Sequence, residues 1–317
     1  MLISIAIPCY RSEKNIARVV EEITQELSKR PENGYQIILV NDCSPDDTWN
    51  VIKGLAENDH HITSINLSRN YGQNNARLAA IPYIEGDVCV CMDDDGQHPA
   101  DQIYTIVDKL MEGYDLVYAK FAHQKQTLMR RIASKLHTQV QEAIGAKPKG
   151  VVNCSFLGWS RFAIDTLKNY HSPFVSAGSF LLKSTTRITN VDVQQRERMS
   201  GHSGYTLKKM INLELTELTN FSNVPLRASG VLGAISAFAG VILGIILLIR
   251  KLISSDFIIG YASVIVFLLI IGGLILLSLG LMGEYIGKIY MTISNQPQYS
   301  VREIVNRKES GSSTESK

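Results

Sequence analysis

The sequence has few tryptophans and cysteines and almost no net charge. Its 317 residues include two tryptophans and five cysteines, and the formal net charge is +2 at pH 7. So small a charge gives no electrostatic reason to expect a nucleic acid as partner. An odd number of cysteines argues against a disulfide framework, and the first residues lack the basic region of a signal peptide. We therefore expect Cys89 and Cys91 to be small buried side chains in a reducing compartment.

Two common nucleotide-binding motifs are also missing. The sequence contains neither GxGxxG nor GxxxxGK[ST]. Both motifs surround phosphate with backbone N–H groups at the start of a helix, so their absence disfavours a dinucleotide oxidoreductase and a P-loop NTPase. Any phosphate site in this chain is therefore expected to use other groups.

Two long segments, residues 228–249 and 257–283, contain no charged residue. At about 1.5 Å per residue, each exceeds the roughly 30 Å hydrocarbon core of a bilayer. Because only residues 250–256 join them, we predict an antiparallel transmembrane hairpin spanning about 228–249 and 257–282. Basic residues that flank the pair agree with a cytoplasmic location for the rest of the chain.

These segments divide the chain into four expected parts. We predict a cytoplasmic α/β domain over residues 1–204 and, from an apolar stripe just before the bilayer, a juxtamembrane interfacial helix over 205–226. The hairpin occupies 227–285. A cytoplasmic tail follows over 286–317, and its polar, low-complexity end is expected to be disordered.

Apolar, β-prone runs alternate with segments of helical periodicity in the first 120 residues. Expected strands lie at 2–8, 36–41, 62–67, 87–92 and 115–120. Strands that alternate with helices predict parallel βαβ units in a mostly parallel, doubly wound sheet. Ligands bind such sheets in a crevice at the carboxyl ends of the strands.

The fourth expected strand runs directly into three aspartates and a glycine. Asp93, Asp95 and Gln97 occur at alternate positions, which would direct three oxygen ligands to one point. Such a set suits Mg²⁺ or Mn²⁺ bridging to a diphosphate. An ordinary acidic turn is the alternative. The polar loops after the other strands, one of which contains Arg69, would line the same edge and favour a metal with a nucleotide diphosphate.

Seven short motifs together carry a resemblance to a known family. In chain order they are IPCY at 7–10, ND-C-S-x-D-x-T at 41–48, SRNYGQ at 68–73, MDDDGQHP at 92–99, EGYDLVYAK at 112–120, R-x-x-G-x-S-G-Y-T at 198–206, and NVPLRASG at 223–230 ahead of the hairpin. The chain thereby resembles family 2 glycosyltransferases of the polyprenyl-phosphate type, a group that includes dolichyl-phosphate mannose synthase, the bactoprenol glucosyl transferases and the undecaprenyl-phosphate aminoarabinose transferases. The resemblance implies a GT-A fold and an inverting, metal-dependent transfer from a nucleotide sugar to a polyprenyl phosphate.

The resemblance also implies a role for each of several residues. For Mg²⁺ or Mn²⁺ the implied ligands are Asp93, Asp95 and Gln97. For the nucleotide they are Pro8, Tyr10, Asp42, Asp46, Arg69 and Asp94, with Asp42 accepting from the base. For the acceptor phosphate they are Arg130, Arg131, Arg198 and Ser203, and the implied catalytic residues are Asp93, Asp95 and Arg198. Structural alternatives stay open: Pro8 could simply end a strand, Asp46 could cap a helix, and Arg198 could be a surface charge.

The chain departs from the pattern of its expected relatives in three places. Many relatives carry an acidic residue and an F-R pair where residues 153–157 read NCSFL. Cys43 stands where glycine is usual, and Arg11 where asparagine is usual. The first departure lies on the side expected to bind the sugar and the acceptor, so it leaves the identity of the sugar open.

We therefore expect a multi-pass enzyme of the bacterial inner membrane that glycosylates polyprenyl (undecaprenyl) phosphate at the cytoplasmic face, for a cell-surface glycan or lipid. Its partners would be the two substrates and the bilayer, and a homo-oligomer is compatible with the sequence. Alternatives are a membrane-anchored scaffold with a degenerate transferase domain, and a transferase for another lipid-linked acceptor. A processive polysaccharide synthase is disfavoured, because neither Trp49 nor Trp159 follows Q-x-x-R.

Overall fold

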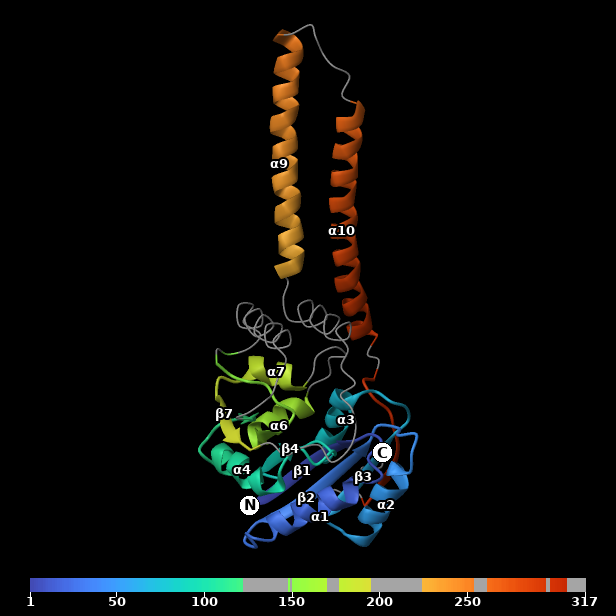
Figure 1. The fold of residues 1–317 in the computed structure, drawn as a ribbon, viewed down its shortest axis with the longest axis vertical. Coiled ribbons are helices and arrows are strands. Elements are labelled where there is room, and N and C mark those ends of the chain that lie inside the picture. The colour runs from blue at the N-terminus through green and yellow to red at the C-terminus, as the bar shows by residue number, and fades with distance from the viewer. Residues whose placement is uncertain are drawn as a thin grey trace, which may run out of the picture. The chain divides into compact units, whose positions relative to one another are not determined.

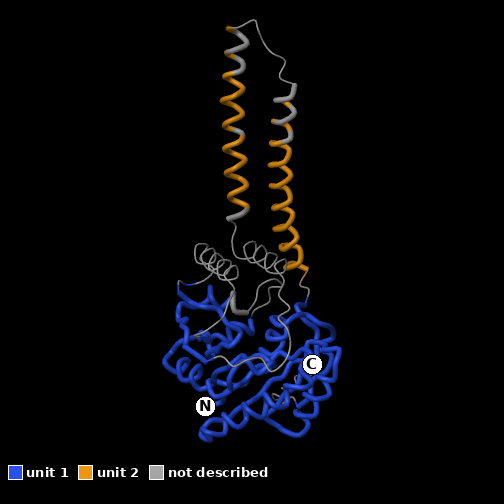
Figure 2. The backbone as a smooth tube through the Cα atoms, viewed as in Figure 1, with its two compact units in different colours: residues 1–204, 297–317 blue, residues 205–296 orange. Residues whose placement is uncertain are grey.

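The computed structural model describes residues 1–121, 148, 150–169, 177–194, 224–253, 261–294 and 297–306. The chain forms two compact units, one of residues 1–204 with 297–317 and one of residues 205–296 (Figure 2). The first unit contains the sheet, and the second contains two long helices.

The first unit is built on a mixed sheet of eight strands in the order β7-β5-β6-β4-β1-β2-β3-β8 (Figure 1). The pairs β1–β2, β1–β4 and β2–β3 are parallel, whereas β6 is antiparallel to both β4 and β5. This confirms the doubly wound, mostly parallel sheet predicted from the sequence. The strands are β1 Leu2–Cys9, β2 Gly34–Asn41, β3 Ile62–Leu67, β4 Val88–Cys91, β5 Leu116–Phe121, β6 Leu157–Ser160, β7 Ile188–Val193 and β8 Val301–Val305.

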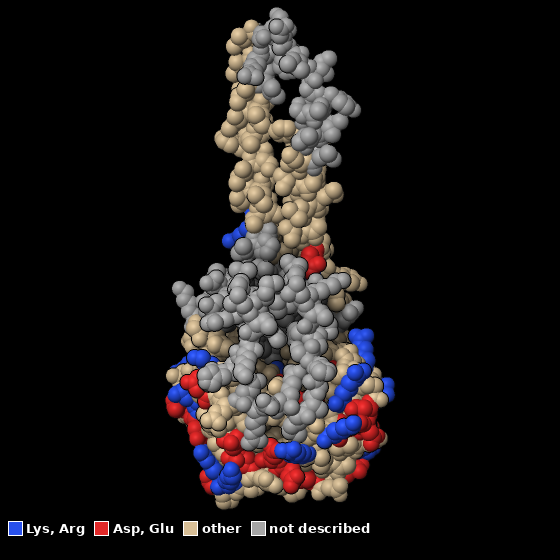
Figure 3. Space-filling model, viewed as in Figure 1, with Lys and Arg blue, Asp and Glu red and all other residues tan. Residues whose placement is uncertain are grey.

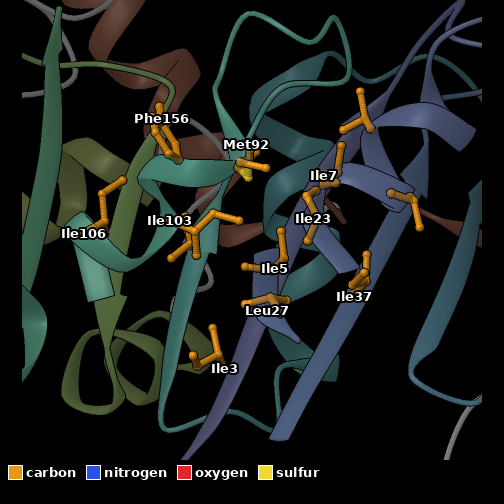
Figure 4. Close-up of a cluster of buried hydrophobic side chains, with 14 of the residues drawn as sticks. Ile3, Ile5, Ile7, Ile23, Leu27, Ile37, Met92, Ile103, Ile106 and Phe156 are labelled. Atoms are coloured by element: carbon orange, nitrogen blue, oxygen red, sulfur yellow. The ribbon is translucent and has the colours of Figure 1, made fainter. Parts of the chain in front are cut away.

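Helices cover both faces of the sheet. On one face lie α1 (Ile16–Leu27), α2 (Thr48–Asn58) and α4 (Ile103–Met111), and on the other lie α3 (Gln73–Ala80), α6 (Arg161–Lys168) and α7 (Ala177–Ser184). Successive strand residues point to opposite faces, so β1 supplies its odd-numbered isoleucines to the first core, which Figure 4 shows. On β4, Cys89 and Cys91 are buried in the second core as free thiols, as predicted.

The strand order reverses beside β1. From β1 the chain proceeds through β2 to β3 on one side, and β4 then pairs with β1 on the other side. In doubly wound sheets this reversal opens a crevice outside the carboxyl ends of the two central strands. Here those ends lead into the loop that begins at Tyr10 and into the loop that begins with the acidic triplet.

The first part of the expected tail, residues 286–317, contains regular structure. Helix α10 continues to Ile293, and residues 301–305 form β8, which pairs antiparallel with β3. This pairing covers the backbone groups of what would otherwise be an open edge strand. Residues 307–317, the end expected to be disordered, lie outside the described part of the chain.

The second unit contains α9 (Val224–Ile253) and α10 (Tyr261–Ile293), which lie side by side (Figure 1). Within them, Leu226–Ile246 and Ile270–Ile293 are long and apolar enough to cross a membrane. Their visible surface carries few charges, in contrast to the surface of the first unit (Figure 3). Most of the predicted interfacial helix, residues 205–223, falls among the residues that the structure does not describe.

Candidate active site at the end of the fourth strand

The two loops at the crevice are joined by Asp94. Its Oδ2 accepts a hydrogen bond of 2.9 Å from the backbone N–H of Tyr10. Burial raises the pKa of Asp94 to about 6, against the opposing effect of that hydrogen bond. The side chain of Asp94 therefore points towards the loop after β1 and ties the end of β4 to the end of β1.

Asp93 is held by side chains from several parts of the chain. Its Oδ1 accepts from Nε2 of Gln73 at 2.6 Å and from Nη2 of Arg77 at 2.8 Å. Its Oδ2 accepts from Oγ of Ser155 at 2.7 Å, and Nε2 of His98 lies 3.5 Å away. Both carboxylate oxygens are thus hydrogen-bonded to protein donors from α3 and from the segment that precedes β6.

The surroundings of Asp93 favour its charged form. Burial alone would raise its pKa, but the charge of Arg77 and the hydrogen bonds from Ser155 and Arg77 hold the pKa below its usual value. Arg77 itself is only 9% exposed. A buried guanidinium beside a carboxylate forms an ion pair whose two members depend on each other.

His98 is a buried, neutral imidazole at this site. The backbone N–H of Asp93 donates to its Nδ1 at 2.9 Å, so that nitrogen carries no proton. Burial lowers the pKa of His98, against the opposing charges of Asp93 and Asp95. Oγ of Ser155 lies 3.4 Å from Nε2 of His98, as a nucleophile would lie from its base. In a hydrolytic triad, however, the Nδ1–H of the histidine donates to the aspartate carboxylate, whereas here Nδ1 accepts a hydrogen bond. The arrangement of serine, histidine and aspartate is therefore not that of a serine hydrolase.

Asp95 and Gln97 lie on the turn that follows. Oδ1 of Asp95 accepts from the backbone N–H of Gln97 at 3.1 Å, and both side chains are partly exposed. Gly96 between them has φ 74°, a conformation that glycine adopts without strain. Carboxylate and amide oxygens of this kind suit Mg²⁺ or Mn²⁺, so the chemistry of the two side chains fits the predicted metal.

Asp42 anchors the loop after β3. Its Oδ1 and Oδ2 accept from the backbone N–H groups of Tyr71 and Gly72 at 2.7 and 2.8 Å. Burial raises its pKa, and the two backbone hydrogen bonds oppose that rise. Asp42 therefore has a structural role beside its predicted contact with a nucleotide base. The guanidinium of Arg69 lies over the ring of Tyr71, 4.7 Å from its centroid, in the same loop.

Pro8, Asp46 and Tyr10 occupy three different settings. Pro8 is buried in β1. Its backbone nitrogen faces the side of β4, but the pairing of β1 with β4 ends at Ala6, so the missing N–H removes no hydrogen bond between the two strands. Asp46 accepts a 2.6 Å hydrogen bond from Oγ1 of Thr48, the first residue of α2. Tyr10 is 43% exposed at the crevice. Pro8 thus lies one residue before the end of β1, and Asp46 precedes Asp47, the N-cap residue of α2, so neither residue has the structural role considered as its alternative.

Four predicted residues, Arg130, Arg131, Arg198 and Ser203, lie outside the described ranges. Conversely, the contacts that Gln73, Arg77, His98 and Ser155 make with Asp93 were missed from the sequence. Gln73 and His98 belong to motifs that were recognised, and Ser155 lies in the segment that departs from the family pattern. Arg77 gave no signal, because a single arginine within a helix is ordinary.

Two residues of the crevice loops have left-handed backbone conformations. Arg11 has φ 58° and Cys43 has φ 50°. These are the positions where the resemblance leads one to expect asparagine and glycine, the residues that adopt this conformation most readily. The departures thus concern side chains, while the backbone keeps the conformation that asparagine or glycine would favour.

Comparisons with known proteins show the family of this chain. A family model described as Glycosyl transferase family 2 matches residues 4–183. Among similar proteins, the undecaprenyl-phosphate 4-deoxy-4-formamido-L-arabinose transferase of Shewanella sediminis is 32% identical over 311 residues, which cover 96% of this chain and 92% of that protein. The protein of the same name from Proteus mirabilis is 30% identical over 313 residues, covering 96% and 94%.

A solved structure shares the fold. It is glucosyl-3-phosphoglycerate synthase from Mycobacterium tuberculosis in complex with Mn²⁺, uridine diphosphate and phosphoglyceric acid, with a TM-score of 0.50 and 18% identity. The similarity covers 69% of this chain and 78% of that one. This identity is low, so the likeness shows the architecture of the first unit and not its substrates.

Proposed function

Because the chain belongs to glycosyl transferase family 2, we propose that it transfers a sugar from a nucleotide sugar to undecaprenyl phosphate or a related polyprenyl phosphate. The observation that carries this proposal is the similarity to undecaprenyl-phosphate transferases over nearly the whole chain, including the segment that contains both apolar helices. The acidic triplet lies at the reversal of strand order, where such sheets bind nucleotides. The retained carboxylates argue against a degenerate scaffold.

The metal would be held by the predicted set of Asp93, Asp95 and Gln97, which follow β4 and are partly exposed. When bound, Mg²⁺ or Mn²⁺ would stabilise the negative charge that develops on the departing nucleoside diphosphate. On the nucleotide side we propose the exposed ring of Tyr10 and the guanidinium of Arg69, at the ends of β1 and β3. Asp42 and Asp94 would keep these two loops in position through their hydrogen bonds to backbone N–H groups.

The acceptor needs no strong general base. A phosphate monoester is already anionic near neutral pH, so the attacking oxygen needs orientation more than deprotonation. This agrees with residues 153–157, which contain no carboxylate. For binding the lipid phosphate we retain Arg130, Arg131, Arg198 and Ser203 as candidates, since arginine guanidinium groups bind phosphate with two parallel hydrogen bonds.

We further propose that α9 and α10 cross the bacterial inner membrane as a hairpin, with the catalytic unit on the cytoplasmic side. Their length and composition support a membrane span. An interfacial helix over 205–226 would bring the crevice to the level of the lipid phosphates. A homo-oligomer is compatible with this arrangement.

The test is transfer of labelled sugar to undecaprenyl phosphate by the full chain purified in detergent. We expect transfer that requires Mg²⁺ or Mn²⁺ and that Asp95→Asn reduces at least 100-fold. The matched control is Asp165→Asn on α6, an exposed aspartate paired with Arg161, which should transfer at the unmodified rate. Transfer undiminished by Asp95→Asn or by EDTA would disprove the metal-dependent mechanism.

A further inference from the structure

Arg77 is unusual among arginines because its side chain is buried. It is 9% exposed, it belongs to α3, and among the described residues its ion pair is with Asp93. Its Nε is buried and has no hydrogen-bond partner in the described part of the chain. Removing a guanidinium from water is costly unless an anion compensates for it, so Arg77 depends on the carboxylate that it contacts.

Asp93 depends equally on the donors around it. Arg77 and Gln73 donate to one oxygen, and Ser155 donates to the other. A divalent cation at Oδ1, about 2.0–2.1 Å away for Mg²⁺, would have to displace Arg77 or Gln73, since this oxygen already accepts two hydrogen bonds. At Oδ2 it would have to fit beside the hydroxyl of Ser155 and the ring of His98, whose Nε2 lies 3.5 Å away. Displacing Arg77 would leave its charge buried without a partner. The donors therefore favour an Asp93 that stays paired.

We propose that Arg77 is a positioning residue that keeps Asp93 out of direct contact with the metal, so that Asp95 and Gln97 alone of the predicted set are ligands. This inference rests on the proposed function and refines its metal site. Asp93 then acts as a fixed point between α3 and the segment before β6. Its position sets where the next two carboxylates are presented, Asp94 to the loop after β1 and Asp95 to the crevice.

The source of the positive charge supports this role. The resemblance leads one to expect a carboxylate and an arginine within residues 153–157, but in this chain that segment contributes the hydroxyl of Ser155. The guanidinium beside Asp93 comes from α3 instead. In this chain the positive charge beside Asp93 is thus supplied by Arg77, and its effect on the metal can be measured without any sugar transfer.

The first experiment measures binding of Mn²⁺ to the full chain in detergent by electron paramagnetic resonance, without nucleotide. We expect Asp95→Asn to weaken binding at least tenfold and Asp93→Asn to weaken it less than threefold. Arg77→Met should not weaken binding, because it frees a carboxylate that can then reach the metal. Equal weakening by Asp93→Asn and Asp95→Asn would overturn the inference, as would failure of the unmodified chain to bind Mn²⁺.

The second experiment measures thermal stability, because Arg77→Met could also destabilise the fold. We expect Arg77→Met to lower the melting temperature and the double variant Arg77→Met with Asp93→Asn to recover at least half of that loss. Additive losses would overturn the pairing. The matched control is Arg18→Met, an exposed arginine on α1 that pairs with Glu22, which should change neither binding nor stability. If all these results hold but undecaprenyl phosphate accepts no sugar, the proposed acceptor is wrong and the role of Arg77 stands.

Discussion

The three adjacent aspartates after β4 have three separate sets of partners. Asp93 accepts from side chains of α3 and of the segment before β6, Asp94 accepts from the backbone of Tyr10, and Asp95 accepts from the backbone of Gln97. Asp94 and Asp95 lie in the turn after β4, and their hydrogen bonds direct the three carboxylates to different parts of the chain. Each of the three carboxylates is therefore compensated by its own protein donors.

At this scale the sequence predicts the acidic triplet but not its surroundings. The apolar run before Asp93 predicts a strand that ends there, so Asp93, Asp94 and Asp95 are expected at the end of β4. The donors to Asp93 come from residues 16 to 62 positions away along the chain. Such contacts depend on how the elements pack, which neither periodicity nor spacing can report.

Backbone strain at Cys43 gives a prediction for a single residue. Its φ of 50° is one that β-branched residues strongly disfavour. We expect Cys43→Val to lower the free energy of unfolding by about 1–3 kcal/mol. Cys43→Gly should change it by less than about 1 kcal/mol, because relief of strain offsets the extra freedom of the unfolded chain. Denaturant unfolding of both variants checks this, and an equally stable Cys43→Val protein would show that the position is not strained.

At the scale of elements, the alternating pattern of the first 120 residues predicts strands β1 to β5 but not β6, β7 or β8. These five strands were predicted because apolar runs alternate with amphipathic helical segments in the sequence. Strand β8 was missed, since a five-residue run beyond an apolar helix carries little local signal. Strand β8 and the residue before it contact the loop after β3. The backbone N–H of Ser68 donates to the carbonyl oxygen of Ser300, and the guanidinium of Arg302 donates to the carbonyl oxygen of Ser68. The loop that Asp42 anchors is therefore also held from the C-terminal side.

Disrupting β8 should loosen that loop. Ile304 pairs with Ile65 of β3 and packs, partly buried, against the second core. We expect Ile304→Glu to lower stability by about 1.5–3 kcal/mol through loss of apolar burial. It should also speed amide hydrogen exchange over residues 64–68 more than elsewhere in the sheet. The control is Glu303→Gln, which alters only a half-exposed ion pair with Lys53. Uniform exchange in the Ile304 variant would show that β8 does not protect this loop.

At the scale of the whole molecule, the chain leaves the first unit after residue 204 and returns to it at residue 297. Both ends of the helix pair are thus continuous with the first unit, and β8 lies in that unit just after the second connection. The presence of the two helices could be predicted from the sequence because uninterrupted apolar runs of this length are distinctive. The ends of the helices were predicted less well: α10 begins at Tyr261 and extends to Ile293, beyond the predicted end near 282.

A charge placed within α10 tests whether this helix resides in lipid. Leu276 is 71% exposed near the middle of α10, and Ile293 is 77% exposed at its last residue. An aspartate at the centre of a membrane span costs about 2.5–3.5 kcal/mol on insertion scales, whereas one at the end can reach water. We expect Leu276→Asp to reduce the fraction of the protein that stays with membranes after alkaline extraction several-fold, and Ile293→Asp to leave it unchanged. Equal retention of both variants would mean that α10 is covered by protein and not by lipid.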